Sequence, residues 1–250
     1  MAPADPTARI LVTGASQGIG KAILLALARS GQQVLGVSRN RPEDLANPAG
    51  SESDYLSWKP LDLSNAADVE QCAVSLEAMA IRALVLCAVD YGANERHPAS
   101  TTSAEEWRQV IATNCIGHCI LVSRLLPKLA ANAPGIIVNL SSDVAILPAT
   151  GRAAYAASKA GLHAMLRAVA AENPAERLRV YQLIPTFQLI TPGLRRRRPA
   201  GFDFSSYGDP ALIGQVVKRL VSPSDSSVAS GSYLVRRDGT MDPYSEITHI

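Results

Sequence analysis

Tyr155 and Lys159 stand four residues apart in an alanine-rich stretch that predicts a helix over residues 151–171. At this spacing the phenol and the ammonium share one face of a helix. A free tyrosine titrates near ~10, so a tyrosine that moves protons near neutral pH needs its phenolate stabilised, at roughly 1.4 kcal/mol per pKa unit. A cation nearby supplies part of that stabilisation. The pair is therefore a candidate for acid–base chemistry, although the same two residue types also meet at this spacing on ordinary exposed helices.

A glycine-rich turn near the start of the chain is a candidate phosphate site. Residues 9–13 form a short apolar run, and Gly14, Gly18 and Gly20 follow it before a helical stretch over residues 21–29. Glycines allow positive φ and close approach of a ligand to the backbone, and the helix N-terminus beyond them offers unpaired N–H groups. The spacing differs from the commonest dinucleotide motif. A glycine turn with a purely structural role is the alternative.

Two polar residues stand in segments that are otherwise apolar. Ser142 follows the apolar run 135–140 and precedes Tyr155 by 13 residues, so a strand end and the next helix can bring the two together. Asn114 lies inside a helical segment, where a buried amide needs a partner. Taken singly, each residue is more often an ordinary capping or core polar residue.

In this order the motifs resemble those of the short-chain dehydrogenase/reductase family, from about Arg9 to about Gly239. The stretch 13–20 is similar to the family's cofactor turn. The resemblance implies four catalytic residues: Asn114, Ser142, Tyr155 and Lys159. In this family the tyrosine is the acid or base, and the lysine lowers its pKa and holds the nicotinamide ribose. The serine orients the carbonyl, and the asparagine positions a water in a proton relay.

The resemblance also implies a cofactor site. Its residues are Gly14, Ser16, Gln17, Gly18, Ile19, Gly20, Arg39, Asp62, Leu63, Ala88, Tyr155, Lys159, Pro185 and Thr186. An acidic residue at the end of the second strand would bond the ribose 2′-hydroxyl and repel a 2′-phosphate. Ser38 stands where NAD-preferring members carry aspartate, and Arg39 can pair bidentately with a phosphate. We therefore expect NADP(H), with NAD(H) as the alternative if Arg39 is a solvated loop residue.

Asp62 resembles the family's adenine-contacting aspartate, and a helix cap for the residues from Ser64 onward is the alternative. The chain also departs from the family pattern at three places. Leu86–Val89 replaces Asn-Asn-Ala-Gly and removes a polar anchor. Thr186 replaces the glycine of a Pro-Gly pair, and the next threonine falls one position late. Asp143 adds a carboxylate beside the catalytic serine, or else faces solvent.

Strand-like runs alternate with helical patterns and predict an α/β, Rossmann-like doubly wound parallel sheet with helices on both faces. The predicted strands are 9–13, 33–37, 55–58, 83–88, 135–140, 179–184 and 232–235. The predicted helices include 64–79, 103–130 and 151–171, and Pro127 should kink or end the second of them. Residues 185–209 are too long for a simple connection and are predicted to form a substrate lid.

The predicted lid carries a run of arginines over residues 195–198, which would attract an anionic or carrier-linked substrate. A solvated loop is the alternative interpretation of this run. Four aromatic residues surround it and would give the lid an apolar lining: Phe187, Phe202, Phe204 and Tyr207.

Length and composition favour one soluble catalytic unit. A chain of 250 residues with 47% hydrophobic content can bury one core, so we expect a single domain over residues 9–250 after a flexible segment over residues 1–8. The net charge of +2 gives no argument for nucleic acid or membrane partners. The start of the chain lacks the parts of a signal peptide, and no apolar run approaches the ~18 residues of a membrane span. We expect a cytoplasmic protein.

The cysteines and histidines give no sign of disulfides or of a metal site, because no C-x-x-C pair occurs with histidines nearby. The cysteines are expected to be buried thiols: Cys72, Cys87, Cys115 and Cys119.

Together the motifs predict an NADP(H)-dependent oxidoreductase, a ketoreductase that transfers hydride between nicotinamide and a small-molecule carbonyl or secondary alcohol. Two alternatives belong to other classes. One is a catalytically impaired sensor or scaffold that binds a nucleotide, and the other is a non-redox dehydratase or isomerase. The resemblance also implies a homo-oligomer, a tetramer or dimer, and the apolar residues of 154–171 would allow helix packing between subunits.

Overall fold

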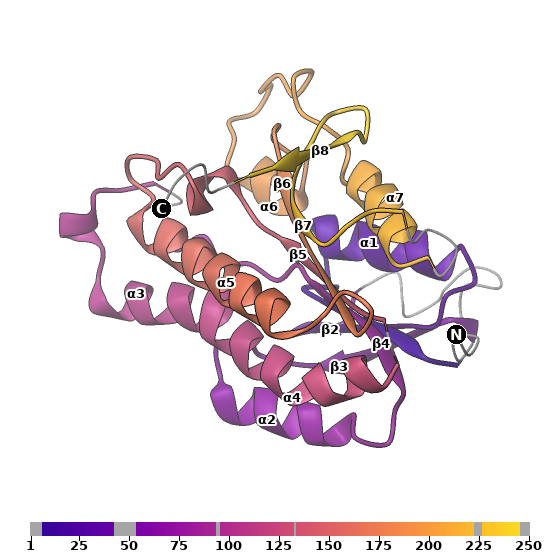
Figure 1. Ribbon diagram of the computed structural model, residues 1–250. Coiled ribbons are helices and arrows are strands. Elements are labelled where there is room, and N and C mark those ends of the chain that lie inside the picture. The colour runs from indigo at the N-terminus through magenta and orange to yellow at the C-terminus, as the bar shows by residue number, and fades with distance from the viewer. Residues whose placement is uncertain (1–6, 43–53, 94–95, 133, 223–226, 246–250) are drawn as a thin grey trace.

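The computed structural model describes residues 7–42, 54–93, 96–132, 134–222 and 227–245. The predicted segment 1–8 lies mostly outside these described residues. Within them, eight strands form one sheet in the order β3-β2-β1-β4-β5-β6-β7-β8 (Figure 1). The strands are β1 (Arg9–Thr13), β2 (Val34–Ser38), β3 (Leu56–Pro60), β4 (Ile81–Leu86), β5 (Gly135–Leu140), β6 (Leu178–Pro185), β7 (Gly231–Val235) and β8 (Met241–Tyr244).

The first seven strands run parallel, and β8 pairs antiparallel with β7. Strand order reverses between β1 and β4, which is the switch point where doubly wound sheets bind ligands. The predicted α/β doubly wound fold is therefore confirmed.

Helices cover both faces of the sheet (Figure 1). They are α1 (Gly18–Ala28), α2 (Ala66–Ser75), α3 (Ala104–Ile111), α4 (Gly117–Ala131), α5 (Ala153–Glu172), α6 (Pro192–Arg196) and α7 (Pro210–Leu220). Two cores result, one with α1 and α7 and one with α2, α4 and α5. Because side chains alternate across a strand, Ile10 and Val12 enter the first core and Leu11 enters the second. Burial on both faces explains the continuous apolar runs of the central strands.

The long helix predicted over residues 103–130 is α3, a π-helical turn over Ala112–Ile116, and α4. Pro127 was predicted to kink or end this helix, and it does not end it, because α4 continues to Ala131 with the proline inside. Leu125 and Leu129, on either side of Pro127, are buried in the second core. Their burial offsets the ~3 kcal/mol that a proline inside a helix costs.

The stretch Ala104–Ala131 has 28 residues and is long and apolar enough to cross a membrane, contrary to the expectation that no stretch approaches such a length. Its buried side chains pack into the core against the sheet, among them Leu121, Leu125 and Leu129. A core helix passes the same test of length and composition, and the packing of α4 is of that kind.

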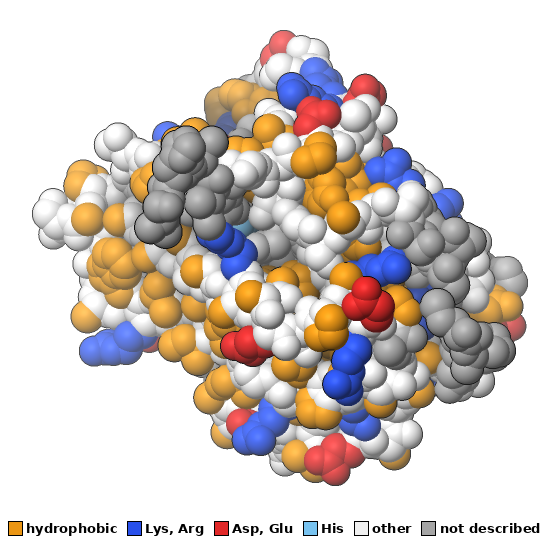
Figure 2. Space-filling model, in the orientation of Figure 1, with side chains coloured by type: hydrophobic (Ala, Val, Ile, Leu, Met, Phe, Trp, Pro, Cys, Tyr) orange, Lys and Arg blue, Asp and Glu red, His pale blue; other side chains and the backbone are white. Residues whose placement is uncertain are grey.

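The four cysteines are free thiols, two of them buried (Cys72 and Cys87) and two half-buried (Cys115 and Cys119). Among the described residues, no group of three or more side chains could hold a metal ion. On the face of the molecule in Figure 2, basic and acidic side chains are interspersed and form no single charged patch.

Candidate active site

The turn between β1 and α1 brings the backbone close to the segment that follows β4. Gly14 has a φ of +69°, and a Cβ at this position would lie 2.6 Å from the Cα of Ala88. At Gly20 a Cβ would lie 2.2 Å from the carbonyl oxygen of Gly14. The N-cap residue of α1, Gln17, makes no side-chain capping bond. The first N–H groups of α1 therefore remain available to a phosphate, as a pyrophosphate site requires.

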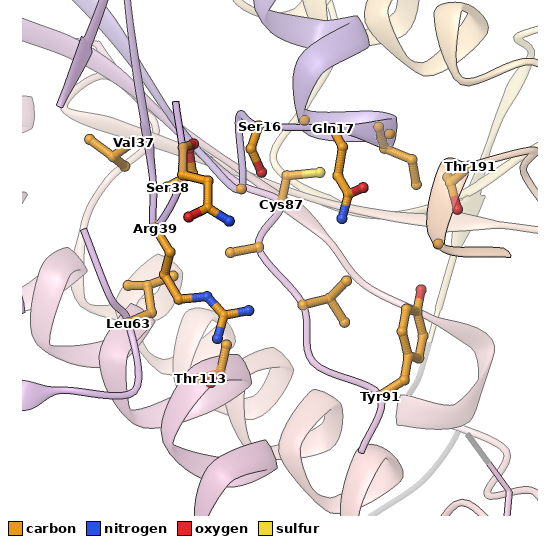
Figure 3. Close-up of a pocket in the computed structure, with 18 of the residues that line it drawn as sticks. Ser16, Gln17, Val37, Ser38, Arg39, Leu63, Cys87, Tyr91, Thr113 and Thr191 are labelled. Atoms are coloured by element: carbon orange, nitrogen blue, oxygen red, sulfur yellow. The ribbon is translucent and has the colours of Figure 1, made fainter. Parts of the chain in front are cut away.

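A cavity of about 270 Å³ lies beyond this turn, at the carboxyl ends of β1, β2 and β4 (Figure 3). Ten of the residues predicted to bind the cofactor line it: Gly14, Ser16, Gln17, Gly18, Ile19, Gly20, Arg39, Asp62, Leu63 and Ala88. Figure 3 shows Arg39 at one end of the cavity and Tyr91 with Thr191 at the other, with Gln17 between them. An elongated site of this kind fits a dinucleotide.

The end of β2 carries a positive charge and no carboxylate. Ser38 is buried, and its Oγ donates to the carbonyl of Asn40 at 2.8 Å and accepts from Trp58 Nε1 at 2.9 Å. The hydroxyl is therefore held within the loop. Arg39 is exposed and lines the cavity. This arrangement lacks the acidic residue that would repel a 2′-phosphate.

Asp62 was predicted either to contact the adenine or to cap the helix that follows it, and its contacts argue against the cap. Its side chain lines the cavity, and its Oδ1 accepts hydrogen bonds from the backbone N–H of Ser64 at 2.9 Å and from the Ser64 hydroxyl at 2.7 Å. The N-cap of α2 is the next residue, Asn65, whose Oδ1 accepts from the N–H groups of Ala67 and Asp68. Asp62 thus shapes the turn before α2 rather than capping the helix itself.

The segment Leu86–Val89, which lacks the family's asparagines, is anchored through Thr13. The Oγ1 of Thr13 accepts hydrogen bonds from the N–H groups of Cys87 at 2.9 Å and Ala88 at 3.1 Å. His118 Nε2 lies 3.0 Å from the same oxygen. A threonine at the end of β1 therefore supplies the polar anchor that this segment lacks.

The tautomer of His118 follows from its two contacts. Its Nδ1 lies 3.2 Å from the carbonyl oxygen of Asn114, which can only accept. Burial lowers the pKa of His118 to about 4, so the ring is neutral near pH 7 and carries its single proton on Nδ1. Nε2 then accepts the hydroxyl proton of Thr13. No chemistry was expected of His118 from the sequence. The ring lies 105 positions from Thr13 in the chain, yet it joins Thr13 to the backbone carbonyl of the predicted catalytic residue Asn114.

Asn114 lies in the π-helical turn between α3 and α4 and is fully buried. Its Nδ2 donates to the carbonyl of Asp90 at 2.7 Å and to Ser158 Oγ at 3.0 Å, and its Oδ1 accepts from the N–H of Asp90 at 2.6 Å. The amide therefore ties the loop after β4 to α5. π-Helical turns are frequent at functional sites. The water relay implied for Asn114 stays a prediction.

The predicted pair Tyr155 and Lys159 lies on α5, and both side chains are buried, 6% and 4% exposed. Burial lowers the pKa of Lys159 to about 8, and its Nζ donates to the carbonyl of Leu140 at 2.8 Å. Burial raises the pKa of Tyr155 well above its usual value, and the Tyr91 phenol raises it further. A hydrogen bond with Ser142 and the charge of Arg152 act in the opposite direction. Tyr155 is therefore protonated near neutral pH and can donate a proton.

Ser142 is positioned by the short 3₁₀ turn that follows β5. Its Oγ donates to Asp143 Oδ1 at 2.8 Å and accepts from the N–H of Val144 at 3.4 Å. Asp143 is exposed, as one of the two interpretations of the sequence held. It also lines a second, smaller cavity that contains Tyr155. The carboxylate thus orients the serine hydroxyl from the solvent side.

A second cavity of about 100 Å³ contains Tyr155 and Ser142 at the carboxyl ends of β5 and β6. It shares four lining residues with the first cavity: Ile19, Tyr91, Thr191 and Arg197. Lys159 lines neither cavity and is buried. The two cavities therefore meet at the end of the cofactor site that is far from Arg39.

Comparison with known proteins identifies the family. A model of the short chain dehydrogenase family matches residues 8–200. The chain belongs to the short-chain dehydrogenase/reductase family. L-Xylulose reductase of Caenorhabditis elegans is 33% identical over 188 residues, which cover 74% of this chain and 73% of that protein.

Further relatives agree with this assignment. A 3-oxoacyl-(acyl-carrier-protein) reductase of Rickettsia bellii is 28% identical over 228 residues, or 87% of this chain and 90% of its own. A metagenomic short-chain oxidoreductase, solved in complex with NADP, superposes with a TM-score of 0.73 at 28% identity, covering 92% of this chain and 96% of its own.

In this short-chain dehydrogenase, the residues after β6 differ from the expected cofactor contacts. Pro185 lines the second cavity, but Thr186 lines neither. The N–H and the hydroxyl of Thr186 both donate to the carbonyl of Val235, at 3.0 and 3.1 Å, because the residue continues the pairing of β6 with β7. Thr191 lines both cavities instead, and its Oγ1 accepts from the N–H of Leu194 as the cap of α6.

The predicted lid of the dehydrogenase contains α6 and carries the arginine run. Arg196 donates to Gln17 Oε1 at 3.2 Å, and Arg197 lies over the ring of Tyr91. Arg195 stacks on Phe204 and Arg198 on Phe202. The four arginines therefore have two roles. Arg195 and Arg198 contact aromatic rings of the lid, and Arg196 and Arg197 line the cofactor cavity.

The aromatic lining expected for the lid is only partly present. Phe187 lines the second cavity. Phe202, Phe204 and Tyr207 instead pack against one another edge to face, with ring centroids 4.9 to 5.8 Å apart, and line neither cavity. These three rings bury part of their apolar surface against one another and do not line a cavity.

Sequence reasoning missed Tyr91 and Arg152. The ring of Tyr91 lies 4.9 Å from that of Tyr155, centroid to centroid, with the planes tilted by 37°. The Cζ of Arg152 lies 4.8 Å from the Tyr155 centroid and 5.9 Å from the Tyr91 centroid. The position of Arg152 one helical turn before Tyr155 was a usable signal. Tyr91 gave none, because its contact with α5 depends on the loop after β4.

Proposed function

We propose that this short-chain dehydrogenase is an NADP(H)-dependent ketoreductase that acts on a small-molecule carbonyl or secondary alcohol. The observation that carries the proposal is the junction of the two cavities. Tyr155 lies protonated in one of them, beside Ser142, and the other runs from this point to Arg39. The names of two relatives, a xylulose reductase and a 3-oxoacyl reductase, and the NADP in a related structure support it.

The protein's own groups perform the proton chemistry. A bound nicotinamide supplies or accepts the hydride. In reduction the Tyr155 hydroxyl donates its proton to the carbonyl oxygen, because burial keeps the phenol protonated. In the free protein the Ser142 hydroxyl donates to Asp143, and on substrate binding it would turn this one proton to the same carbonyl oxygen. The ammonium of Lys159 then stabilises the phenolate, since both groups lie buried on one face of α5.

Cofactor preference rests on Arg39. A guanidinium that bonds a 2′-phosphate contributes roughly 1.5–3 kcal/mol, or about 10- to 100-fold in affinity. We expect wild type to bind NADPH more tightly than NADH by this factor in a fluorescence titration. Arg39→Ala should lose most of the preference, whereas Arg41→Ala, an exposed arginine outside the cavity, should keep it. Equal affinities in wild type would refute the assignment.

Turnover separates the reductase from its two alternatives. A reductase oxidises NADPH in proportion to the ketone consumed, and Tyr155→Phe should abolish this without preventing NADPH binding. A dehydratase or isomerase would convert substrate with no net loss of NADPH. A sensor or scaffold would bind the nucleotide and turn over nothing.

We further propose a cytoplasmic homo-oligomer, a tetramer or dimer, and light scattering after gel filtration gives its mass.

A further inference from the structure

Two guanidinium groups lie beside the proposed proton donor. Arg152, the N-cap residue of α5, lies 4.8 Å from the ring centroid of Tyr155. Arg197, the C-cap residue of α6, lies 4.9 Å from the ring centroid of Tyr91. Both line the cavity that contains Tyr155 and Ser142. Residues from two separate elements therefore bring positive charge to the place where a substrate carbonyl would bind.

Both guanidiniums lie over aromatic rings, Arg152 over Tyr155 and Arg197 over Tyr91. A guanidinium lying over an aromatic ring keeps its N–H groups in its own plane, at its edge, where they match the two oxygens of a carboxylate. The one acidic residue among those that line this cavity is Asp143. Its Oδ1 already accepts hydrogen bonds from Ser142 Oγ and from the N–H of Val144. Positive charge thus exceeds negative charge in the cavity wall.

The two arginines differ in which cavity they face. Arg152 lines only the cavity of Tyr155, whereas Arg197 lines both cavities. Arg196 lines only the cofactor cavity, where it bonds Gln17. Of the two arginines, Arg152 can therefore contact only a ligand in the Tyr155 cavity. Arg197 lies where the two cavities meet.

Building on the proposed reductase function, we propose that Arg152 and Arg197 form an anion subsite and that the substrate is a small oxo acid. Its carboxylate binds the two guanidiniums while its carbonyl oxygen faces Tyr155 and Ser142. The cavity of about 100 Å³ is well below the ~300–1,000 Å³ of pockets for drug-sized ligands, which favours a short molecule.

The reaction balances with the groups named. The carbonyl carbon receives the hydride that NADPH supplies, and the carbonyl oxygen receives the proton of Tyr155. The oxo acid becomes a hydroxy acid, NADPH becomes NADP⁺, and solvent restores the proton to the phenolate. The carboxylate is unchanged and serves only to bind and orient the substrate.

The test compares short oxo acids with their own methyl esters, such as acetoacetate with methyl acetoacetate and levulinate with methyl levulinate. We expect wild type to show kcat/KM values about 10- to 100-fold higher for the acid, the range for hydrogen bonds to a charged group. Arg152→Met should reduce the acid-to-ester ratio about tenfold or more. The ratio isolates carboxylate binding, because any effect of Arg152 on the Tyr155 proton acts on both substrates alike. Arg195 lies in the lid, as Arg197 does, but lines neither cavity, so Arg195→Met should leave the ratio unchanged.

The outcomes separate the two proposals. Reduction of esters as fast as acids by wild type overturns the anion subsite and leaves the reductase function standing. An acid preference that survives in Arg152→Met places the anion elsewhere and also overturns the subsite. If no carbonyl is reduced, the reductase function fails. Calorimetric titration with butanoate then decides the subsite without turnover, and binding that is equal in wild type and Arg152→Met overturns it.

Discussion

Replacing Lys159 with methionine tests whether a charged ammonium is buried on α5, four residues after the candidate catalytic Tyr155. The side chain is 4% exposed, and burial lowers its pKa from 10.5 to about 8. At roughly 1.4 kcal/mol per pKa unit, this depression means that the charged form costs the native state about 3 kcal/mol. Lys159→Met removes that cost and also removes the hydrogen bond to the Leu140 carbonyl.

The pH dependence separates these two effects. Below about pH 8 both native and unfolded wild type hold the proton, so the full cost is present. Between about pH 8 and 10.5 the unfolded state binds more protons than the native state, so wild-type stability rises with pH. Methionine does not titrate. The free energy of unfolding of Lys159→Met relative to wild type should therefore fall by about 3 kcal/mol from pH 7 to pH 10.5. The lost hydrogen bond changes this difference by the same amount at every pH.

Urea unfolding followed by circular dichroism measures this difference at each pH. Lys159→Gln is a matched variant, because it also lacks a titrating group and should show the same slope with a different constant. Both variants should lose ketone reduction if Lys159 stabilises the phenolate. A difference in stability that does not change between pH 7 and 10.5 would refute the burial of a charged lysine in this site.

Two further variants probe the cofactor turn. His118→Leu leaves the Thr13 hydroxyl without its ring partner, so it should lower the free energy of unfolding by about 1–3 kcal/mol and weaken NADPH binding. Urea unfolding and fluorescence titration measure these two effects. Unchanged binding and stability would contradict the role given to the ring. Gly20→Ala places a Cβ 2.2 Å from a backbone oxygen, so we expect no NADPH binding and a lower melting temperature, and a wild-type melting curve would contradict the close packing of the turn.

Local sequence patterns predicted much of the sheet. The predicted bounds of β1 and β5 match the structure, because each is a continuous apolar run between turn residues. β8 was not predicted, since its four residues include Asp242 and Pro243 and show no apolar alternation. Its position follows from pairing with β7, and a proline is tolerated there because β8 is an edge strand. Tertiary pairing determines such an element more than its own residues do.

The same distinction holds for the candidate site. Tyr155 and Lys159 were predicted because their spacing within one helix fixes their relation. The stacking of Tyr91 on Tyr155 and the approach of Arg197 join residues far apart in sequence, so they depend on how the loop after β4 and the lid cross the sheet. Thr186 shows the reverse case: the family motif predicted a ligand contact, whereas its N–H and hydroxyl both bond the carbonyl of Val235 and the residue lines neither cavity.

The departure at Leu86–Val89 favours an impaired cofactor site when the sequence is taken alone, but the contacts around the segment show that another residue anchors it. Thr13 accepts two backbone N–H groups of this segment, and His118 holds Thr13 on one side and the Asn114 carbonyl on the other. The neutral tautomer of His118 satisfies both partners only with its proton on Nδ1. His118 thereby joins the cofactor turn to the π-helical turn before α4. The network therefore favours an intact cofactor site, and impaired NADPH binding in His118→Leu is the result that this reasoning requires.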